Sequence, residues 1–478
     1  QRKIFVDEKI NEIIKLIDKF NETTNSKLII TNLGLPHYSP HGIAEMNTNY
    51  SFHDAIIDFN KKLKDKVIEM NSVHVFDFFK FVVKHGENNV FNFQNYLFGD
   101  IKISLDYIPY LANEFIPYVI SFLGLTKKCI VVDLDNTLWG GIVGEDGFDG
   151  IRLGPQPPGN AFIEFQKYLK ALSQRGILLA INSKNNFDDA IQVIREHPSM
   201  ILKENDFSCM KINWNNKASN MLEISEELNI GLDSFVFFDD DPVNRELIKE
   251  NMPEITTPDL PHDPSLYSEV IQSLHDFSTF QITSEDTKRG QMYLEQKQRS
   301  VSQNSSSNIS EFLKTLDLEI EIKKTNSFTI PRISQLTLKT NQFNLTTKRY
   351  QEDEIKKFSE NNNILIGCAQ IKDKFGDNGI TGVFIVEKTN SDEWFLDTFL
   401  LSCRVMGREA EKAMLYFIIK QAKKNNVKRL KAKFIPTLKN KPIEDFLSNS
   451  QFYEENGFWI YNLEKPFNMP EFLTLREE

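Results

Sequence analysis

The chain has 478 residues, of which 40% are hydrophobic and 26% charged, and its formal net charge is -11 at pH 7. This length predicts two to four domains of ordinary globular composition. The acidic balance argues against a general nucleic-acid binder, and no apolar run reaches the length of a membrane-spanning helix. The four cysteines contain no CxxC pair, which favours a reduced, cytoplasmic setting.

The first 122 residues are expected to form a small α/β unit. Residues 1–20 have the pattern of an amphipathic helix, and residues 27–35 and 73–79 have the pattern of strands. The chain begins at Gln1 rather than Met, which is compatible with a piece of a longer polypeptide.

Residues 123–284 alternate between the two kinds of pattern. Strands are expected at 128–135, 177–183 and 234–241, and helices at 160–176, 188–197 and 217–230. This alternation is typical of a Rossmann-like parallel sheet with crossover helices.

The second half of the chain begins with a polar, Ser- and Asn-rich segment at 299–310, which is the strongest linker candidate. From 310 to 478 the pattern changes to a helix, longer strands, an amphipathic helix, a strand and a final helix. We therefore expect a second, different α/β domain there.

Polar residues suited to one reaction follow the expected strands of the middle region. They are Asp133 and Asp135, Ser183, Lys217 at the start of a helix, and Asp239, Asp240 and Asp241. Ligands of open parallel sheets bind at the carboxyl ends of the strands. Paired carboxylates, a hydroxyl, a cation and an acidic metal site suit phosphoryl transfer through an aspartyl phosphate. The plainer alternative is that Asp135 caps the next helix and that 239–242 is a turn.

The segment 133–138, DLDNTL, resembles the first motif of the haloacid-dehalogenase-like phosphotransferases. The resemblance implies that Asp133 is the nucleophile and Asp135 the general acid and base. It implies that Ser183, Lys217 and Thr137 contact the phosphate, and that Asp240 completes a Mg²⁺ site with Asp133 and the main-chain oxygen of Asp135. Mg²⁺ suits an all-oxygen site of this kind.

Three longer stretches, DLDNTLWGGIVGEDG, INWNNKASN and FFDDDPVNRE, resemble the FkbH-like family. Members of that family load a glyceryl unit from 1,3-bisphosphoglycerate onto an acyl carrier protein in polyketide pathways. The resemblance covers most of the chain. It implies a degenerate SGNH-like, non-catalytic unit at 1–122, a phosphatase domain at 123–284 and a GNAT-like acyltransferase domain at 310–478, possibly within a larger polyketide synthase polypeptide.

Residues 393–426 are expected to form a strand, a tight loop and a helix. The loop resembles the pyrophosphate loop of GNAT-type acyltransferases, with Arg404 and Gly407 matching and Glu409 departing from it. A carboxylate beside a pyrophosphate is unfavourable, so the phosphopantetheine arm of a carrier protein fits this loop better than coenzyme A. Asn341, Asn344 and Asp377 are candidates for a pocket around the glyceryl hydroxyls, or equally for turns.

Cys403 is the candidate acyl-accepting thiol. It ends the expected strand, beside Arg404, Arg408 and a helix N-terminus, all of which favour a thiolate. The alternative is a buried small hydrophobic residue. Residues 412–443 contain many lysines and no carboxylate, which predicts either a docking face for an acidic carrier protein or an ordinary solvated surface.

Together these features predict a bifunctional enzyme that takes glyceryl from 1,3-bisphosphoglycerate, removes phosphate and loads the glyceryl group onto a carrier protein. One rival is a stand-alone Mg²⁺-dependent phosphatase of a small phosphorylated acid or sugar. Another is a scaffold whose second domain only docks a carrier.

Overall fold

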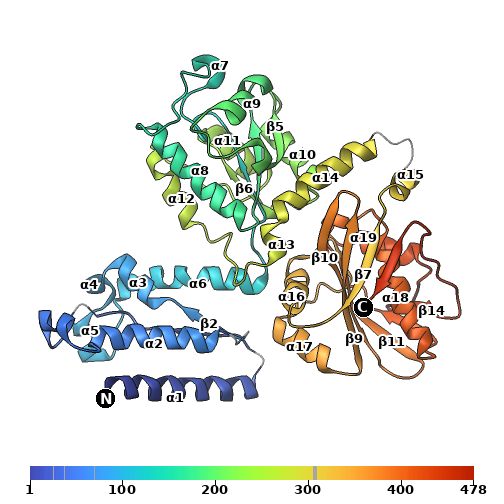
Figure 1. Ribbon diagram of the computed structural model, residues 1–478, viewed down its shortest axis with the longest axis horizontal. Helices are drawn as coiled ribbons and strands as arrows, with labels where there is room; N and C mark the ends of the chain where they lie inside the picture. Colours follow the sequence, from blue (N-terminus) through green and yellow to red (C-terminus); the bar gives the residue numbers. More distant parts are fainter. Residues whose placement is uncertain (25, 37, 69, 71, 305–308) are drawn as a thin grey trace. The chain divides into compact units, whose positions relative to one another are not determined.

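The computed structural model describes residues 1–478 except 25, 37, 69, 71 and 305–308. The chain divides into two compact units, Gln1–Val119 and Ile120–Glu478. Both are built from helices and strands, which confirms the predicted α/β class (Figure 1). Among the described residues, no helix has the length and apolar character needed to cross a bilayer.

The first unit is built around a short parallel pair of strands, in which β1 (Leu28–Thr31) lies beside β2 (Val73–Phe76). The predicted amphipathic helix is present as α1 (Arg2–Thr23), and α2 (Phe52–Val67) begins with a capping box formed by Ser51 and Asp54. The apolar faces of these two helices meet in one core. The unit also contains α3 (Phe78–His85), α4 (Glu87–Val90), α5 (Phe93–Gly99) and most of α6 (Ile108–Leu123). Its SGNH-like ancestry stays a prediction.

The second unit contains the expected parallel sheet, with strands in the order β5-β4-β3-β6. Their bounds are β3 (Cys129–Val132), β4 (Leu178–Ser183), β5 (Phe207–Ile212) and β6 (Phe235–Phe238). Strand β5 has no counterpart in the sequence analysis. It lies at the sheet edge and carries Ser208 and Lys211, so its apolar pattern is interrupted.

Successive side chains of these strands enter two different cores, as the two-residue period of a strand requires. Ile130 and Val132 belong to one core, and Cys129 and Val131 to the other. The first core is covered by α8 (Gly159–Gln174), α9 (Phe187–Glu196) and α12 (Tyr267–Ser273), and the second by α10 (Lys217–Leu228) and α11 (Pro242–Asn251). Both faces of the sheet are thus buried, which explains the continuous apolar runs in the sequence.

The C-terminal part contains a second, mixed sheet with the order β13-β14-β12-β11-β10-β9-β7-β15. Its strands are β7 (Glu319–Lys324), β9 (Ile364–Asp373), β10 (Gly376–Glu387), β11 (Glu393–Leu401), β12 (Arg429–Ala432), β13 (Tyr453–Glu455), β14 (Phe458–Asn462) and β15 (Thr474–Glu477), with β8 (Phe343–Asn344) beside β11. The helices are α15 (Ile309–Lys314), α16 (Ile330–Lys339), α17 (Glu352–Glu360), α18 (Ala410–Lys424) and α19 (Lys441–Asn449). The predicted strand, loop and helix at 393–426 correspond to β11 and α18.

The region around the expected linker differs from the prediction. Helix α13 (Ser284–Thr287) is followed by α14 (Arg289–Asn304), so residues 299–304 are helical rather than irregular. Residues 305–308 of the predicted linker lie outside the described residues. Arg299 of α14 forms a bidentate ion pair with Asp373 at 2.7 and 2.9 Å, and Arg408 donates to the same carboxylate at 2.9 Å. These buried contacts join α14 to the second sheet. The proposed boundaries of the domains at 284 and 310 stay predictions.

Candidate active site

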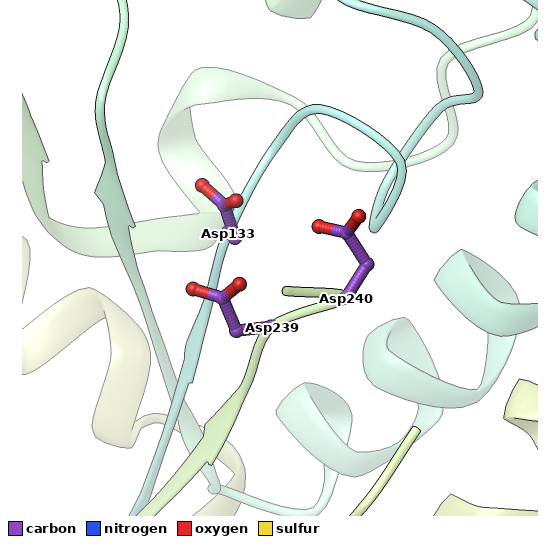
Figure 2. A group of neighbouring side chains, drawn as sticks. All are labelled: Asp133, Asp239 and Asp240. Atoms are coloured by element: carbon purple, nitrogen blue, oxygen red, sulfur yellow. The ribbon is translucent and has the colours of Figure 1, made fainter. Parts of the chain in front are cut away.

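Three carboxylates converge where β3 and β6 end. Asp133 follows β3, Asp239 and Asp240 follow β6, and each offers an oxygen within 4.8 Å of the others. Figure 2 shows the three side chains turned toward a common space. The main chains of the two strands fix this approach, because the Asp133 amide donates to the carbonyl of Phe238 at 2.9 Å. Strand pairing therefore brings together residues that lie more than one hundred positions apart.

Lys217 supplies the positive charge of this cluster. It is the first residue of α10, it is only 1% exposed, and its Nζ lies 2.9 Å from Asp133 Oδ2 and 2.5 Å from Asp239 Oδ2. Burial lowers the pKa of Lys217, but the attraction of Asp133 and Asp239 outweighs it and raises the pKa above its ordinary value. The ammonium is therefore held in its charged form.

The carboxylates remain incompletely neutralised. Burial, followed by repulsion from Asp133, raises the pKa of Asp239 to about 6 and that of Asp240 to about 7. Asp133 Oδ1 is buried and has no hydrogen-bond partner among the described residues. One ammonium facing three acids, with an orphaned carboxylate oxygen, fits a site that holds an added divalent cation.

Asp135 occupies a different position from the other acids. Its Oδ1 accepts hydrogen bonds from Trp139 Nε1 at 2.9 Å and from the Val143 amide at 3.1 Å. Its Oδ2 accepts from Asn185 Nδ2 at 2.8 Å. Burial is the largest influence on this group and raises its pKa above the ordinary range. The side chain is thus held in one orientation, and the upward shift of its pKa is in the direction that a proton donor needs.

The remaining predicted residues of this site lie around the same edge. Ser183 ends β4 and is 1% exposed. Thr137 Oγ1 accepts the amide of Asp240 at 3.2 Å, so this hydroxyl positions the loop after β6 in addition to its predicted phosphate contact. Asp241 caps α11 by accepting from the Val243 amide at 2.9 Å, so its carboxylate is occupied at the start of this helix.

Several positioning residues escaped the sequence analysis. Arg245 is buried and donates to the main-chain oxygens of Asp239 and Asp240 at 2.8 and 2.7 Å. Asn182 donates to the carbonyl of Lys217 at 2.9 Å, and Asn220 donates to Asn182 at 3.0 Å. Asn220 and Arg245 lie within two of the stretches quoted in the sequence analysis, where no role was assigned to them. Asn182 and Asn185 have no charge and belong to no such stretch. Their only sequence signal is a concentration of Asn after β4 and around the start of α10.

The predicted acyl-handling residues are only partly brought together. Cys403, Arg404 and Asn341 line one cavity, near the beginnings of β3, β4 and β6. Gly407 lies in the loop before α18 with a φ of +78°, a conformation that glycine adopts without strain. Arg408 points toward Asp373 and Gln296 rather than toward the thiol.

Two members of that predicted set make local contacts. Asn344 is fully buried; its Nδ2 donates to Thr340 O at 3.0 Å and its Oδ1 accepts from the Thr347 amide at 3.0 Å. Asp377 lies in the β9–β10 hairpin and accepts from the Gly379 amide at 2.8 Å and from Gln370 Nε2 at 2.6 Å. Both make the turn contacts that the sequence had left open as an alternative, and neither is among the residues described as lining the cavity. Their place in a glyceryl pocket stays a prediction.

Comparison with known proteins identifies a relative that contains a phosphatase domain. No protein-family model and no curated protein matches the chain. A crystal structure of the N-terminal part of the protein BF1531 from Bacteroides fragilis, containing a phosphatase domain complexed with Mg, is 33% identical, with a TM-score of 0.53. The match covers 57% of this chain and 73% of that one. This chain therefore belongs to the same family as that phosphatase-domain protein, and its parallel sheet has the haloacid-dehalogenase-like phosphatase fold.

Matches to acetyltransferases are weaker. The ribosomal-protein-S18-alanine N-acetyltransferase from Escherichia coli is 12% identical and covers 31% of this chain and 96% of its own, with a TM-score of 0.25. A putative GNAT-family acetyltransferase from Desulfovibrio desulfuricans is 10% identical, covers 30% and 99%, and has a TM-score of 0.25. No conclusion about this chain rests on likenesses at this level.

Proposed function

We propose that this protein is a bifunctional glyceryl transferase and Mg²⁺-dependent phosphatase that charges an acyl carrier protein. The observation that supports the phosphatase half most strongly is the ammonium of Lys217 between Asp133 and Asp239, with Asp240 beside them. The transferase half rests on the resemblance of the loop at Arg404 and Gly407 to the pyrophosphate loop of GNAT-type acyltransferases, and on the cavity at Cys403.

In the phosphatase half, Asp133 attacks the phosphorus of a phosphate monoester and the bond from phosphorus to the ester oxygen breaks. Asp135 donates its proton to the departing oxygen and then takes a proton from the water that hydrolyses the aspartyl phosphate. A Mg²⁺ ion held by Asp133, Asp240 and the main-chain oxygen of Asp135 would offset the charge on the phosphoryl oxygens. Lys217 and the amides at the strand ends orient the phosphoryl group.

In the transferase half, Cys403 Sγ attacks the acyl carbon of 1,3-bisphosphoglycerate. A carbon–sulfur bond forms, the bond from the acyl carbon to the phosphate oxygen breaks, and inorganic phosphate leaves with the thiol proton. The phosphopantetheine thiol of the carrier then displaces Cys403, which regains a proton. No redox partner is needed for either exchange.

The two reactions use opposite ends of the strands of one sheet. Asp133 lies at the end of β3, whereas the cavity at Cys403 includes Lys128, directly before that strand begins. Cys129 and Asp133 are about 13 Å apart along a strand of ~3.3 Å per residue, and β3 between them is fully buried. A phosphoglyceryl group on Cys403 cannot pass through this core. We infer that its phosphate is removed after transfer to the carrier.

The rim of the phosphatase site also suits a carrier-borne substrate. Trp214 after β5, Phe187 after β4 and Val243 after β6 are 70%, 47% and 73% exposed. Exposed apolar groups clustered at one edge are typical of a protein contact surface. A small free phosphoester would leave them in water.

The test is intact-mass analysis of carrier protein after incubation with enzyme, Mg²⁺ and 1,3-bisphosphoglycerate. The native enzyme should yield a glyceryl carrier, and Asp133→Asn should yield a phosphoglyceryl carrier instead. Asp241→Asn is the matched control, because asparagine also caps a helix, and it should behave as the native enzyme. Unmodified carrier in every reaction would refute the transferase half, and an unphosphorylated product from Asp133→Asn would refute the phosphatase assignment.

A second candidate function is hydrolysis of small phosphoesters without a carrier. The separation of the two sites favours this alternative, because the Asp133 site could then act without the site at Cys403. Rapid turnover of 3-phosphoglycerate, combined with no reaction of phosphoglyceryl carrier, would support this alternative over the proposal.

A further inference from the structure

A cavity of about 90 Å³ lies at the other end of the phosphatase strands from Asp133, between the beginnings of these strands and the C-terminal part. This volume exceeds the ~10–15 Å³ needed for one water. Helices α14 and α16 close it, and Cys403 contributes to its wall. The lining contains one carboxylate, Asp233, and six basic residues: Lys128, Arg289, Arg332, Lys339, Arg404 and Lys439.

Two of the basic groups are neutralised by acids. Lys439 Nζ lies 2.5 Å from Asp233 Oδ2, and Arg289 is paired with Asp286. Asp286 also accepts from Gln335 Nε2 at 2.7 Å, which anchors it to α16. Four basic residues of the lining are not part of these two ion pairs.

The other four cations have no salt bridge to any residue that the structure describes. Lys128 Nζ donates to the carbonyl of Lys339 at 3.2 Å, and Arg332 Nε donates to that of Ile380 at 3.1 Å. Arg404 and Arg332 are only 8% and 5% exposed. Burying charge without a counterion is costly, so this arrangement favours an anion that enters from solvent.

The electrostatics of the cavity agree with this reading. Burial, reinforced by Arg289, lowers the pKa of Lys339 to about 7, while Asp286 opposes the shift. Burial likewise lowers the pKa of Lys128 and of Arg332. The carboxylates facing these cations are Asp286, Glu285 and Asp233.

The cavity also contains an unused acceptor. Gln342 Oε1 is buried and has no hydrogen-bond partner among the described residues, although it belongs to the lining. Asn341 lies next to it, and its Oδ1 accepts from Arg349 at 3.0 Å. A hydroxyl group next to the anion would satisfy the free acceptor.

We propose that this cavity binds the phosphoryl group of a small phosphorylated hydroxy acid and thereby presents the acid's carbonyl carbon to Cys403. Arg332, Arg404, Lys339 and Lys128 hold the phosphoryl oxygens, and Gln342 accepts a hydroxyl of the same molecule. The assignment rests on the proposed function, since that function supplies the acyl chemistry at Cys403. It goes beyond it by giving the transferase its own phosphate site, separate from the one at Asp133.

The experiment measures how fast iodoacetamide alkylates Cys403 in the full chain with Asp133→Asn, so that no ligand is hydrolysed. The other three cysteines are fully buried, so the modified peptide reports on Cys403. The probes are 3-phosphoglycerate, inorganic phosphate and glycerate. Saturating 3-phosphoglycerate should slow the alkylation of Cys403 at least tenfold. Inorganic phosphate should compete with 3-phosphoglycerate for the cavity, and glycerate should not change the rate.

Two added substitutions test the cations. Arg332→Met and Lys339→Met should each raise the apparent Kd for 3-phosphoglycerate at least tenfold. Lys420→Met, which removes an exposed partner of Glu477, should leave it unchanged. Circular dichroism checks folding, and Arg332→Lys replaces Arg332→Met if the latter fails to fold. No protection by 3-phosphoglycerate, or equal protection in the Arg332 and Lys339 variants, would overturn the proposal.

The result separates this site from the proposed function. Protection without any transfer to carrier would refute the transferase half and leave the anion site standing. Normal transfer by Arg332→Met with Asp133 intact would refute the anion site and leave the function standing. Protection by phosphate and 3-phosphoglycerate to the same maximum and with equal affinity would mean that only inorganic phosphate is recognised, which also contradicts the proposal.

Discussion

Lys217 balances the charges of the phosphatase site. Its ammonium is fully buried and contacts Asp133 and Asp239 at 2.9 and 2.5 Å. Removing one member of a buried charge cluster leaves the others uncompensated, which is far more costly than never having buried them. The stability of the metal-free protein should therefore depend strongly on this single residue.

We expect Lys217→Met to lower the free energy of unfolding by about 3–5 kcal/mol without Mg²⁺ and to lower kcat for phosphoester hydrolysis by about 10²–10³-fold. Urea denaturation and steady-state kinetics measure the two effects. Lys249→Met is the control, because Lys249 forms surface ion pairs with Glu246 and Asp259. Its stability change should be below about 1 kcal/mol, and equal losses in the two variants would contradict this account.

Helix α16 shows how one element serves two purposes. Ile333 and Leu336 enter the core between the helix and the second sheet, whereas Arg332, Gln335 and Lys339 line the basic cavity. Spacings of three and four residues place these polar side chains along one side of the helix. The amphipathic pattern that forms the helix therefore also carries the cations to the cavity.

The pKa of Lys339 makes the stability of this element depend on pH. Because its folded-state pKa is near 7 rather than 10.5, the unfolded chain binds more protons than the folded protein between these pH values. In buffer without phosphate, the free energy of unfolding should therefore rise from pH 7 to pH 10. Lys339→Met should be more stable than the native chain at pH 7, by on the order of 4 kcal/mol, and this advantage should shrink to about 1 kcal/mol near pH 10.

Urea denaturation at both pH values tests this expectation. Lys428→Met removes an exposed partner of Asp392 and should produce no pH-dependent difference. If the stability advantage of Lys339→Met instead grew towards high pH, the predicted sign of this pH dependence would be wrong.

At the scale of the whole molecule, the decisive feature is that the two candidate sites lie at opposite ends of the strands of one buried sheet. An intermediate that remains on Cys403 cannot reach Asp133 of the same chain. A carrier that dissociates after the first reaction can deliver it to any copy of the enzyme. The two activities should therefore be separable between molecules.

Mixing the Asp133→Asn and Cys403→Ala proteins tests this separation. Alone, the first should leave a phosphoglyceryl carrier and the second an unmodified carrier. Together, they should restore the unphosphorylated glyceryl carrier, detected by intact mass. Failure of the mixture to restore it, with both single variants folded, would mean that phosphate is removed before the acyl group leaves the enzyme.

The predicted basic docking face shows what a run of charge in the sequence leaves out. Residues 412–443 contain no acid, yet Lys420 pairs with Glu477, Lys428 with Asp392, and Lys431 and Arg429 with Glu393. Acids from distant segments return to this surface when the sheet forms. A run of one charge in the sequence therefore does not establish a face of that charge, and carrier docking there stays a prediction.

The sequence alone was enough to predict three strands of the parallel phosphatase sheet, the helices α8, α9 and α10, and the acids at the strand ends, because these depend on local apolar periodicity and on short motifs. It could not find β5, whose edge position breaks that periodicity, nor Arg245 and Asn185, which act through contacts with distant main chain or side chains. Only the tertiary structure decided that Asn344 and Asp377 serve turns, and that Cys403 shares a basic cavity with α16 and the beginnings of the strands. The physical reason is that pairing and burial across long separations leave no trace in neighbouring residues.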